Sequence, residues 1–443
     1  PTRPTTPGPD LPRFCRGRGR NSQAPDEGCL TGPQGPAPRP KMVWETLVNL
    51  VCRPPRYTYD PDEVLGPKRF RIDGKLFERV DLEVLNKRRQ RLKCSHYMPI
   101  VEGGKQQQAR FPCVIYCHGN CGSRVDASDC LDLLLPQSIS VFAFDFSGSG
   151  LSDGETISLG YYEQDDLIAV IEYLRSSGLV SRIGLWGRSM GAATSVLVAA
   201  RDPSIAGMVL DSSFSSLTQV MYELANQYMR QVKVPKVLIN GAISVLRKAV
   251  QKKGNFDIRD VNPEEACAKS FIPSLFAHAD GDDFVLVHHS KTLYERYNGD
   301  KNIITFGGDH NSPRPAFFFD SVGIFFHNVL IHNHEPDPAQ MSGLEVYSAY
   351  RQPNLTGGGG RMVGQGGNEV RMSPPKEPLS DAWGDSHALQ AAFSSFLQGP
   401  EGGGEDSVIQ ALRTSLREME AELGPNDPNV VELRNMLSEY QRR

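Results

Sequence analysis

Short runs of β-branched and aromatic residues alternate with segments of helical periodicity from about residue 44 to residue 330. This alternation is typical of a mostly parallel sheet whose strands are joined by crossover helices. Several runs, such as CVIY and VFAF, are apolar throughout, which suits strands covered on both faces. The pattern predicts one α/β domain over 42–334, with helices on both faces of its sheet. Strands are expected at 77–85, 91–97, 113–116, 139–145, 183–186, 207–211, 274–278 and 302–306, and helices at 162–176, 190–201 and 288–297.

A further helical segment is inserted between the expected strands 207–211 and 274–278. Its apolar residues recur at helical spacing over about 217–253 and would form one buried face, so we interpret it as a small helical cap over the edge of the sheet. Glu223 is its single acid, whereas its basic residues are Arg230, Lys233, Lys236, Arg247, Lys248, Lys252 and Lys253. These basic residues form either a solvated helix face or a surface that attracts an anionic membrane or an acidic substrate.

The two ends of the chain have a different composition from the domain. The first 40 residues contain ten prolines and six glycines, too little apolar surface to offset the entropy of ordering, so 1–41 is predicted to be a disordered tail. Met42 opens the first amphipathic segment, which leaves open whether this tail is the remnant of a longer product or a leader. Glycine, proline and serine dominate 335–404, which predicts a flexible linker. Helical periodicity returns over 405–443.

Charge and hydropathy exclude several classes of function. The 443 residues include 48 basic and 52 acidic side chains, and this balance argues against a general nucleic-acid binder. The best candidate for a membrane-spanning helix, Ala316–Ile331, is interrupted by Asp320 and His327, so a transmembrane segment is not expected. The nine cysteines are irregularly spaced, which predicts free thiols in a reducing, cytoplasmic compartment.

Three of those cysteines recur at every fourth position, at Cys113, Cys117 and Cys121. Such spacing can indicate a metal site. The first two, however, lie in the strand-like run FPCVIYCHGN, and strand geometry would not bring them together. Neither a metal nor an organic cofactor is expected.

A candidate nucleophile follows the expected strand 183–186. In the sequence RIGLWGRSMGAATSV, a short apolar strand runs into GRSMG at 187–191 and then into a helix of small residues. A sharp strand-to-helix turn holds a nucleophile in a strained backbone conformation, and flanking glycines let neighbouring elements approach closely. The G-x-S-x-G pattern alone is weakly specific, but its context of strand, turn and helix predicts Ser189 as the nucleophile.

Two backbone N–H groups are predicted to stabilise the negatively charged oxygen of a tetrahedral intermediate. The N–H of Met190, directly after the serine, is the first donor. The second is expected in CVIYCHGNCGS, where a strand is followed by His118, Gly119 and Asn120. Gly119 would let the loop turn so that the N–H of Asn120 points inward. The alternative is that His118 and Gly119 only form a tight turn.

An orienting acid and a general base should follow the serine, each in a loop after a later strand. The expected strand 274–278 leads into HADGDDFV, which offers three carboxylates. Asp282 is preferred because it lies four residues after the end of the strand and three before Val285; Asp283 is second and Asp280 third.

The histidine expected to act as base follows the next strand. His310 lies in the glycine-rich loop GGDHN after 302–306, whereas His288 and His289 begin a predicted helix and His327 lies in an apolar helix-like run. His310 would then take the proton of Ser189 and return it to the leaving group.

The motifs HGN, DFSGSGLSDG, GRSMG, HADGDDFV and GGDHN occur in this order between about residues 60 and 330. In these residues the chain resembles the serine aminopeptidase-like group of the α/β-hydrolases. It is also similar to the depalmitoylating thioesterases among α/β-hydrolase-domain proteins, and VCRPP at 51–55 resembles the opening of plant and algal proteins of that type. The resemblance implies an α/β-hydrolase fold with Ser189, Asp282 and His310 as the triad and Asn120 and Met190 as oxyanion donors.

These features predict a serine hydrolase that cleaves an acyl ester or thioester. A serine peptidase of the aminopeptidase type is an alternative, although a basic cap disfavours a protonated amine as substrate. A non-catalytic, ubiquitin-binding adaptor built on a hydrolase fold is a second alternative. Peripheral membrane contact is a further hypothesis, through an acylated Cys52 beside Met42, Val43, Trp44 and Leu47.

The C-terminal segment resembles a ubiquitin-interacting motif. The acidic residues Glu401, Glu405 and Asp406 come before a stripe at helical spacing. The residues of this stripe that would contact ubiquitin are Val408, Ala411, Leu412 and Ser415, and Glu418 follows them. The alternative is a helical hairpin across Gly424 and Pro425. Its facing residues would be Leu412, Leu416, Met419 and Leu423 on one helix and Val430, Leu433, Leu437 and Tyr440 on the other.

Overall fold

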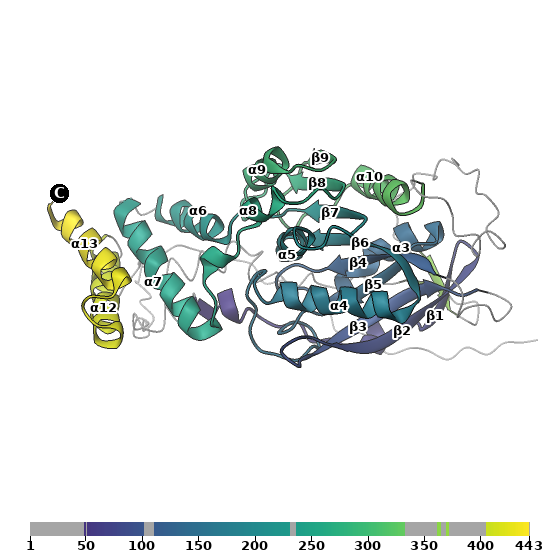
Figure 1. The fold of residues 1–443 in the computed structure, drawn as a ribbon, viewed down its shortest axis with the longest axis horizontal. Coiled ribbons are helices and arrows are strands. Elements are labelled where there is room, and N and C mark those ends of the chain that lie inside the picture. Colours follow the sequence, from purple (N-terminus) through teal and green to yellow (C-terminus); the bar gives the residue numbers. More distant parts are fainter. Residues whose placement is uncertain are drawn as a thin grey trace, which may run out of the picture. The chain divides into compact units, whose positions relative to one another are not determined.

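The computed structural model describes residues 48–49, 51–101, 110–230, 236–332, 361–364, 369–371 and 405–442. Within them, eleven strands form one sheet in the order β11-β10-β1-β2-β3-β5-β4-β6-β7-β8-β9 (Figure 1). The strands from β5 to β9 in this order are parallel, and β1, β2 and β3 are antiparallel to their neighbours. The strands are β1 (Arg69–Ile72), β2 (Lys75–Leu85), β3 (Arg91–Pro99), β4 (Phe111–Cys117), β5 (Ser140–Phe144), β6 (Val180–Arg188), β7 (Gly207–Asp211), β8 (Ser274–Ala279), β9 (Lys301–Phe306), β10 (Arg361–Gly364) and β11 (Glu369–Arg371).

All eight strands expected from the sequence are present as β2 to β9, with small shifts of their ends. The expected helices correspond to α4, α5 and α9. The predicted mostly parallel sheet with helices on both faces is therefore confirmed. The helices of the domain are α2 (Pro61–Val64), α3 (Ser128–Leu134), α4 (Glu163–Ser177), α5 (Met190–Ala199), α8 (Pro263–Cys267), α9 (His288–Arg296) and α10 (Ala316–His327), with short helical turns at Arg124–Ala127, Leu135–Gln137, Ile258–Asp260 and Asn328–His332.

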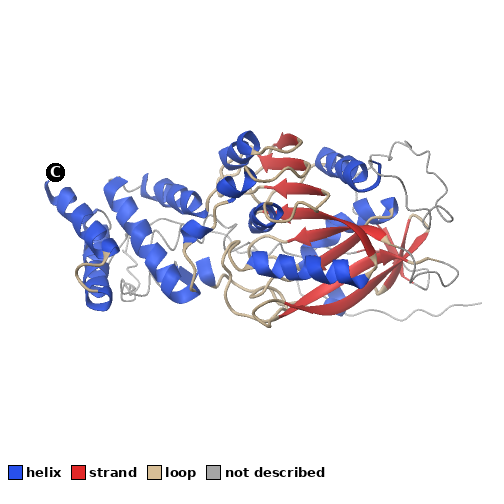
Figure 2. Ribbon diagram, in the orientation of Figure 1, coloured by secondary structure: helices blue, strands red, loops and turns tan. Residues whose placement is uncertain are grey.

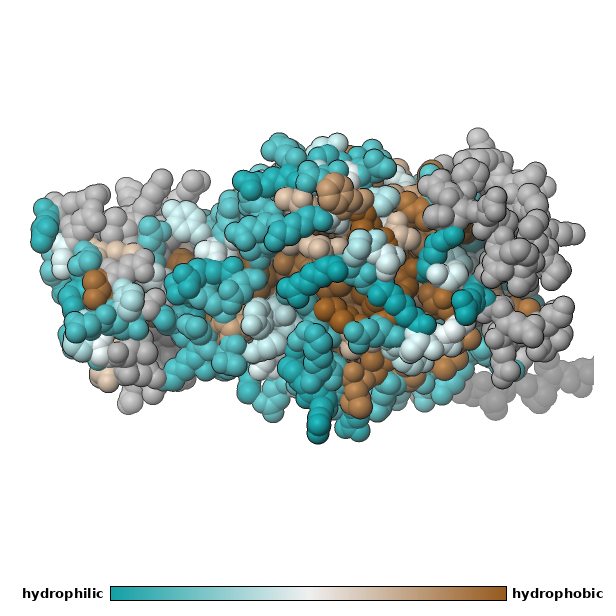
Figure 3. Space-filling model, in the orientation of Figure 1, coloured by the Kyte–Doolittle hydropathy of each residue, from teal (hydrophilic) through white to brown (hydrophobic). Residues whose placement is uncertain are grey.

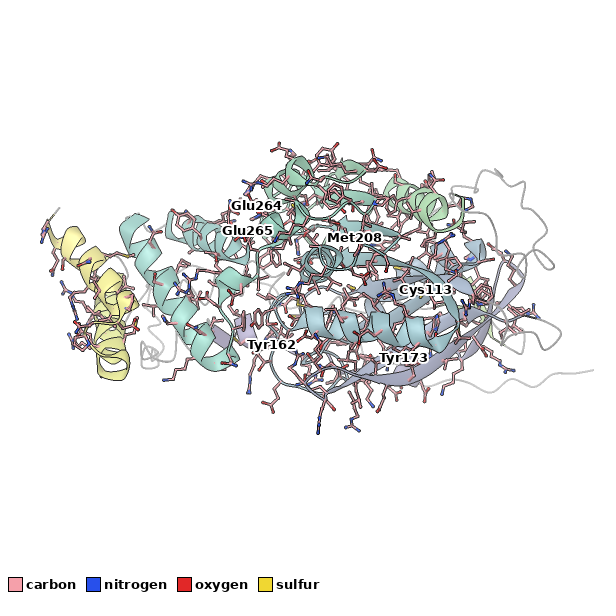
Figure 4. All side chains as sticks on the ribbon, in the orientation of Figure 1. Cys113, Tyr162, Tyr173, Met208, Glu264 and Glu265 are labelled. Carbon is pink, nitrogen blue, oxygen red and sulfur yellow. The ribbon has the colours of Figure 1, made fainter. Side chains whose placement is uncertain are left out.

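Helices lie on both faces of the sheet (Figure 2), and a hydrophobic cluster is buried on each face. Successive side chains of a strand point to opposite faces, so the apolar run of β4 contributes to both. Cys113 of β4 and Met208 of β7, labelled in Figure 4, belong to the cluster under α4, α5 and α9. Val114, the next residue of β4, belongs to the cluster under α3 and α10. A sheet buried on both faces explains why its central strands read as continuous apolar runs.

The parallel strands place four loops at one edge of the sheet. Parallel strands end at the same edge, and β4, β6, β8 and β9 run in the same direction. The loops after these four strands are those predicted to carry the oxyanion donor, the nucleophile, the acid and the base. Residues nearly 200 positions apart in the sequence are thereby brought to one site, at the position where open α/β sheets bind their ligands.

The segment between β7 and β8 contains α6 (Leu217–Arg230) and α7 (Lys236–Gly254), where the sequence predicts a helical cap. Lys252 and Lys253 are exposed, whereas two other charged residues of this segment have partners outside it. Arg247 is mostly buried, and its Nε lies 3.1 Å from Oδ2 of Asp257, an acid just beyond the predicted segment. Glu223 faces two histidines of α9 rather than the basic residues of the cap. The side chains of Arg230, Lys233 and Lys236 lie outside the described residues.

Parts of the chain ends are also described. Strands β10 and β11 lie inside 335–404, and β10 pairs with β1, so these seven residues depart from the predicted flexible linker. The physical reason is that β1 is otherwise an edge strand with unpaired backbone groups, which a short apolar run such as that of Met362 and Val363 can pair. The predicted disordered tail 1–41 and the rest of 335–404 lie outside the described residues.

The C-terminal segment forms two helices, α12 (Glu405–Leu423) and α13 (Pro428–Arg442). Leu412, Leu433 and Leu437 are buried in one hydrophobic cluster with residues of α7. A Cβ atom built on Gly241 of α7 would lie 3.8 Å from Cδ1 of Leu412 and 3.1 Å from Cδ1 of Leu433. Contacts of this kind favour the helical hairpin over an exposed stripe at Leu412. The side chains of Val408, Ala411, Ser415 and Glu418 lie outside the described residues.

None of the described helices is long and apolar enough to cross a membrane. On the face drawn in Figure 3, hydrophilic residues cover most of the described surface, and hydrophobic residues are visible between them. Cys52, the candidate for acylation, is fully buried, and burial raises the pKa of its thiol to about 11. Acylation of Cys52 would therefore require its segment to leave the position that it occupies here.

Candidate active site

Ser189 stands between β6 and α5 in a backbone conformation that residues with side chains rarely adopt. Its φ and ψ angles are 51° and −114°, and the residue is 8 % exposed. Two backbone hydrogen bonds hold this conformation: the N–H of Ser189 donates to the carbonyl of Asp211 on β7 at 2.8 Å, and its own carbonyl accepts from Ala193 at 3.0 Å. The strained turn predicted from the sequence is thus present at this serine.

The glycines on either side of Ser189 are required by close packing. A Cβ atom on Gly191 would lie 2.0 Å from the carbonyl oxygen of Cys117, at the end of β4. A Cβ atom on Gly187 would lie 2.5 Å from the backbone of Ala192. Both obstacles are backbone atoms, which cannot rotate away as a side chain can. The absence of side chains therefore lets α5 begin directly against the ends of β4 and β6.

The three residues predicted as nucleophile, base and acid lie within hydrogen-bond distance of one another. Nε2 of His310 is 3.1 Å from Oγ of Ser189, and Nδ1 of His310 is 2.6 Å from Oδ2 of Asp282. The other oxygen of Asp282, Oδ1, accepts from the backbone N–H groups of Phe284 at 3.1 Å and Val285 at 2.8 Å. Distances of this size are those expected for a serine, an imidazole and an orienting carboxylate.

The environment of Asp282 keeps it ionised. Burial by itself would raise the pKa of this carboxyl group, but the electrostatic attraction of His310 and the hydrogen bonds from His278 and His310 lower it by more. The pKa of Asp282 is therefore held well below its usual range. Because the carboxylate can only accept hydrogen bonds, the Nδ1 atom of His310 carries the ring proton, and its Nε2 atom is left to accept the proton of Ser189.

The structure also separates Asp282 from the two other candidate acids. Asp280 and Asp283 are exposed, whereas Asp282 is buried and contacts His310. The two backbone N–H groups that bond Asp282 come from the positions two and three residues later, which is a local turn motif of aspartate. The order of preference derived from the sequence thus agrees with the observed geometry.

The predicted oxyanion donors flank Ser189. Met190 is the first residue of α5, where a helix leaves its N–H without an intrahelical acceptor. Asn120 and Met190 line the same pocket as Ser189. A Cβ atom on Gly119 would make ordinary contacts at 3.6 and 3.8 Å, and the left-handed conformation in this loop belongs to Cys121, with φ of 61°. The N–H of Gly122 donates to the carbonyl of Gly119 at 3.1 Å, so the turn begins at Gly119 and includes Cys121.

A small apolar pocket lies beside Ser189 and is partly open to solvent. Helix α6 and the segment before it form one wall, and the loop after β8 forms another. The described lining residues are Asn120, Leu159, Ser189, Met190, Phe214, Leu217, Val220, Met221, Phe284 and Val285. None of them carries an ionisable carboxyl, amine or imidazole group. The side-chain amide atoms of Asn120 are buried without a hydrogen-bond partner among the described residues.

Four residues of the site were not singled out from the sequence. Arg314 donates to both carboxylate oxygens of Asp211, at 2.9 and 3.0 Å, and to the backbone carbonyl of His310 at 3.3 Å. Arg188 donates to the same carbonyl at 3.1 Å. Arg314 holds the pKa of Asp211 below its usual range although burial alone would raise it. The fourth residue, His278, contacts Asp282.

Only position in the sequence could have indicated these four residues. Arg188 lies within GRSMG, Arg314 follows His310 by four residues, and His278 and Asp211 end strands. None of these positions by itself predicts the contacts observed.

Within the described residues, one group has the composition of a metal site. Oxygen atoms of Glu223 on α6 lie 2.8 Å from Nε2 of His288 and 2.9 Å from Nε2 of His289. The Nδ1 atom of His289, however, accepts the N–H of Ser215 at 3.2 Å, so the ring proton is on Nε2 and points to Glu223. A metal ion would have to displace that proton. The donor set therefore favours a hydrogen-bonded link between α6 and α9, which we call the α6–α9 link.

Comparisons with known proteins agree with the observed architecture. Residues 112–234 match the family model described as alpha/beta hydrolase fold. The uncharacterized protein YqkD of Bacillus subtilis is 32 % identical over 205 residues, which cover 44 % of this chain and 64 % of YqkD. The uncharacterized protein YfhR of Escherichia coli is 28 % identical over 202 residues, 44 % of this chain and 62 % of YfhR. The chain thus spans less than two thirds of either relative. Taken with the observed sheet, these findings show that the chain has the α/β-hydrolase fold.

Among solved structures, the chain is similar to the esterase Pf2001 of Pyrococcus furiosus. The TM-score is 0.46 at 21 % sequence identity, and the match covers 63 % of this chain and 99 % of the esterase.

Proposed function

We propose that this protein is a serine hydrolase that cleaves acyl esters or thioesters through an acyl-enzyme intermediate. The observation that carries the proposal is the chain of contacts from Ser189 through His310 to Asp282, at 3.1 and 2.6 Å, at the mouth of an apolar pocket. A strained serine, a neutral imidazole and a buried carboxylate in this order are the parts that acyl transfer requires.

The proposed reaction has two halves. Ser189 attacks the carbonyl carbon of the substrate while His310 takes its proton, and His310 then gives that proton to the departing alcohol or thiol. Water repeats the sequence and releases the acid. Asp282 stays ionised throughout, because its low pKa keeps it from taking the proton of His310, and it stabilises the imidazolium that forms.

Backbone groups would stabilise the negative charge that develops on the substrate oxygen. The N–H groups of Met190 and Asn120 are the proposed donors, since both residues line the pocket at Ser189. Loss of one such donor typically costs about 10²- to 10³-fold in kcat. The role of Met190 depends on where α5 begins and therefore on Gly191.

The pocket supports an acyl group as the part of the substrate that it binds. Val220 and Met221 of α6, Phe284 and Leu159 offer apolar contacts but no charge. Burying one more methylene group contributes about 0.8 kcal/mol, so kcat/KM should rise about fourfold for each carbon added until the chain fills the pocket. An amino acid substrate would instead place a protonated amine among these residues without a carboxylate to bind it.

Two finer points belong to the same proposal. The resemblance of the chain to depalmitoylating thioesterases supports a thioester as one of its substrates. Ubiquitin binding by the C-terminal helices remains a prediction. The burial of Leu412 against α7 implies that α12 would have to separate from α7 before this side chain could contact a partner.

A fluorophosphonate probe tests the proposal directly, because it labels only an activated serine. We expect the wild-type chain to be labelled and Ser189→Ala to remain unlabelled. Hydrolysis of p-nitrophenyl acetate, butanoate and hexanoate should then increase along the series, and leucine p-nitroanilide should not be cleaved. A folded wild-type chain that takes no label would refute the hydrolase function. Cleavage of the anilide in preference to the esters would instead establish the peptidase alternative.

A further inference from the structure

His278 is a buried histidine that the proposed reaction does not use. It lies on β8 and is fully buried. Its Nε2 atom is 2.7 Å from the carbonyl oxygen of Val285 and 3.2 Å from Oδ2 of Asp282. Its Nδ1 atom is 2.7 Å from Oγ of Ser290, on α9. The imidazole therefore spans the space between the acid loop and a neighbouring helix.

The partners of His278 decide which of its nitrogen atoms carries the proton. A backbone carbonyl and an ionised carboxylate can only accept hydrogen bonds, so Nε2 is a donor. In the tautomer with its proton on Nε2, Nδ1 can accept the hydroxyl proton of Ser290, whose oxygen also lies 3.5 Å from the carbonyl oxygen of Ser213. The N–H of Nε2 donates to the carbonyl oxygen of Val285 at 2.7 Å, and Oδ2 of Asp282 lies 3.2 Å from the same nitrogen atom. Contacts on both sides of the ring thus orient His278 so that its N–H points toward the loop that contains Asp282 and Val285.

With His278, four nitrogen atoms surround the Asp282 carboxylate. Oδ1 accepts two backbone N–H groups, and Oδ2 accepts from Nδ1 of His310 and lies 3.2 Å from Nε2 of His278. An ionised carboxylate has about four such acceptor positions. Only one of these four donors, His310, exchanges protons with the nucleophile in the proposed reaction. The other three fix the direction in which Oδ2 faces His310.

We infer that His278 is a positioning residue for the reaction, an inference that rests on the proposed function. It acts through Asp282: its N–H keeps Oδ2 directed at His310, and the same N–H closes the loop from Asp282 to Val285. Phe284 and Val285 also line the pocket. The N–H of His278 therefore helps to fix Asp282 and one wall of the pocket relative to each other. Removal of that donor should lower kcat through misorientation of His310, with a smaller effect on KM.

Two amide substitutions separate the donor from the bulk of the imidazole. In His278→Gln the side-chain amide reaches the place of Nε2, so it can still donate to Asp282. In His278→Asn the amide reaches only the place of Nδ1, so the bond to Asp282 is lost while a polar group remains beside Ser290. Both variants place an uncharged amide, which does not titrate, at the same buried position, so they form a matched pair.

The experiment measures kcat and KM for p-nitrophenyl butanoate in the full chain, with thermal unfolding to verify folding. We expect His278→Asn to lower kcat about 10- to 100-fold with KM changed less than about threefold, and His278→Gln to restore kcat to within about fivefold of wild type. In the background of Asp282→Asn, His278→Asn should lower kcat by less than about twofold, because the residue acts through that carboxylate.

Equal loss in the Asn and Gln variants, or a loss that is fully additive with Asp282→Asn, would overturn the positioning role while leaving the hydrolase function intact. Absence of Ser189-dependent turnover in the wild type would overturn both. If His278→Asn does not fold, Ser290→Ala takes its place: without the hydroxyl donor Nδ1 is free to take the ring proton, and kcat should fall several-fold. Unchanged kcat in a folded Ser290→Ala would then count against the orientation of His278 proposed here.

Discussion

Replacement of Gly191 by alanine would place a methyl group where the backbone of β4 already lies. The added Cβ atom would be 2.0 Å from the carbonyl oxygen of Cys117, 2.5 Å from its carbon and 2.7 Å from the carbonyl oxygen of His118. These atoms belong to the end of a central strand. Neither the strand nor the first turn of α5 can rotate out of the way, so the start of the helix has to move.

The size of this movement follows from the distances. Cβ atoms essentially never approach other heavy atoms closer than 3.0 Å, and the contact starts at 2.0 Å, so α5 must shift by about 1 Å. Overpacking of this kind costs about 1–3 kcal/mol, offset by about 1 kcal/mol from the better helix propensity of alanine. A displacement of about 1 Å at a reacting group can lower the rate about 100-fold. We therefore expect a modest loss of stability and a large loss of kcat.

Gly323→Ala is the matched control, because Gly323 is also a helical glycine with a close neighbour. Its Cβ atom would lie 2.9 Å from Cδ1 of Leu133, the end of a side chain that can rotate. The assay is urea unfolding together with the rate of fluorophosphonate labelling. Gly323→Ala should keep the wild-type rate, whereas Gly191→Ala should lose about 100-fold. A Gly191→Ala variant that is labelled within threefold of wild type would refute the argument that this close approach sets the position of Ser189.

Two further predictions concern buried histidines. Glu223→Gln should lower the free energy of unfolding by about 1–3 kcal/mol and raise KM more than it lowers kcat, because the α6–α9 link holds one wall of the pocket. Urea unfolding and ester kinetics test this, with the exposed Glu172→Gln as the control. Equal stability and kinetics of the two variants would contradict the prediction. Burial lowers the pKa of His96 to about 3. The stability that neutral His96 contributes is therefore fully present above pH 6.5 and is lost as the pH falls from 6.5 toward 3. Between pH 7.5 and pH 5.5, the free energy of unfolding should fall by about 1 kcal/mol more in the wild type than in His96→Gln. Equal losses of stability would contradict a lowered pKa of His96.

The fold could be predicted because burial on both faces leaves a strong signal in the sequence. Strands β4 and β5 are apolar at nearly every position. A surface helix of similar length would carry polar residues on its solvent face. Strand β1 was missed because its four residues, RFRI, alternate arginine with apolar side chains for too short a distance to be distinguished from a loop. Strand β10 is as short as β1 and β11 is one residue shorter, and β10 depends on pairing with β1, which is a non-local contact.

The site was predictable where its residues follow a strand directly. Ser189, Asp282 and His310 each occupy a loop after a parallel strand, and the topology alone brings such loops together. The left-handed residue of the oxyanion loop could not be located from the sequence, because a glycine in a loop does not by itself require that conformation, and here Cys121 adopts it. His278 could not be recognised, because its importance depends on the distance and direction of its ring from Asp282 and not on its place in a motif.

The contacts of Asp211 show why the distance between Ser189 and His310 cannot be predicted from the sequence of either of their two loops alone. Its backbone carbonyl holds the N–H of Ser189 at 2.8 Å, while its carboxylate binds Arg314 through two hydrogen bonds. Arg314 in turn donates to the carbonyl of His310. One residue at the end of β7 therefore fixes the serine through its main chain and the histidine through its side chain. The 3.1 Å between Oγ of Ser189 and Nε2 of His310 therefore depends on β7, one of the two strands that lie between β6 and β9 in the sheet.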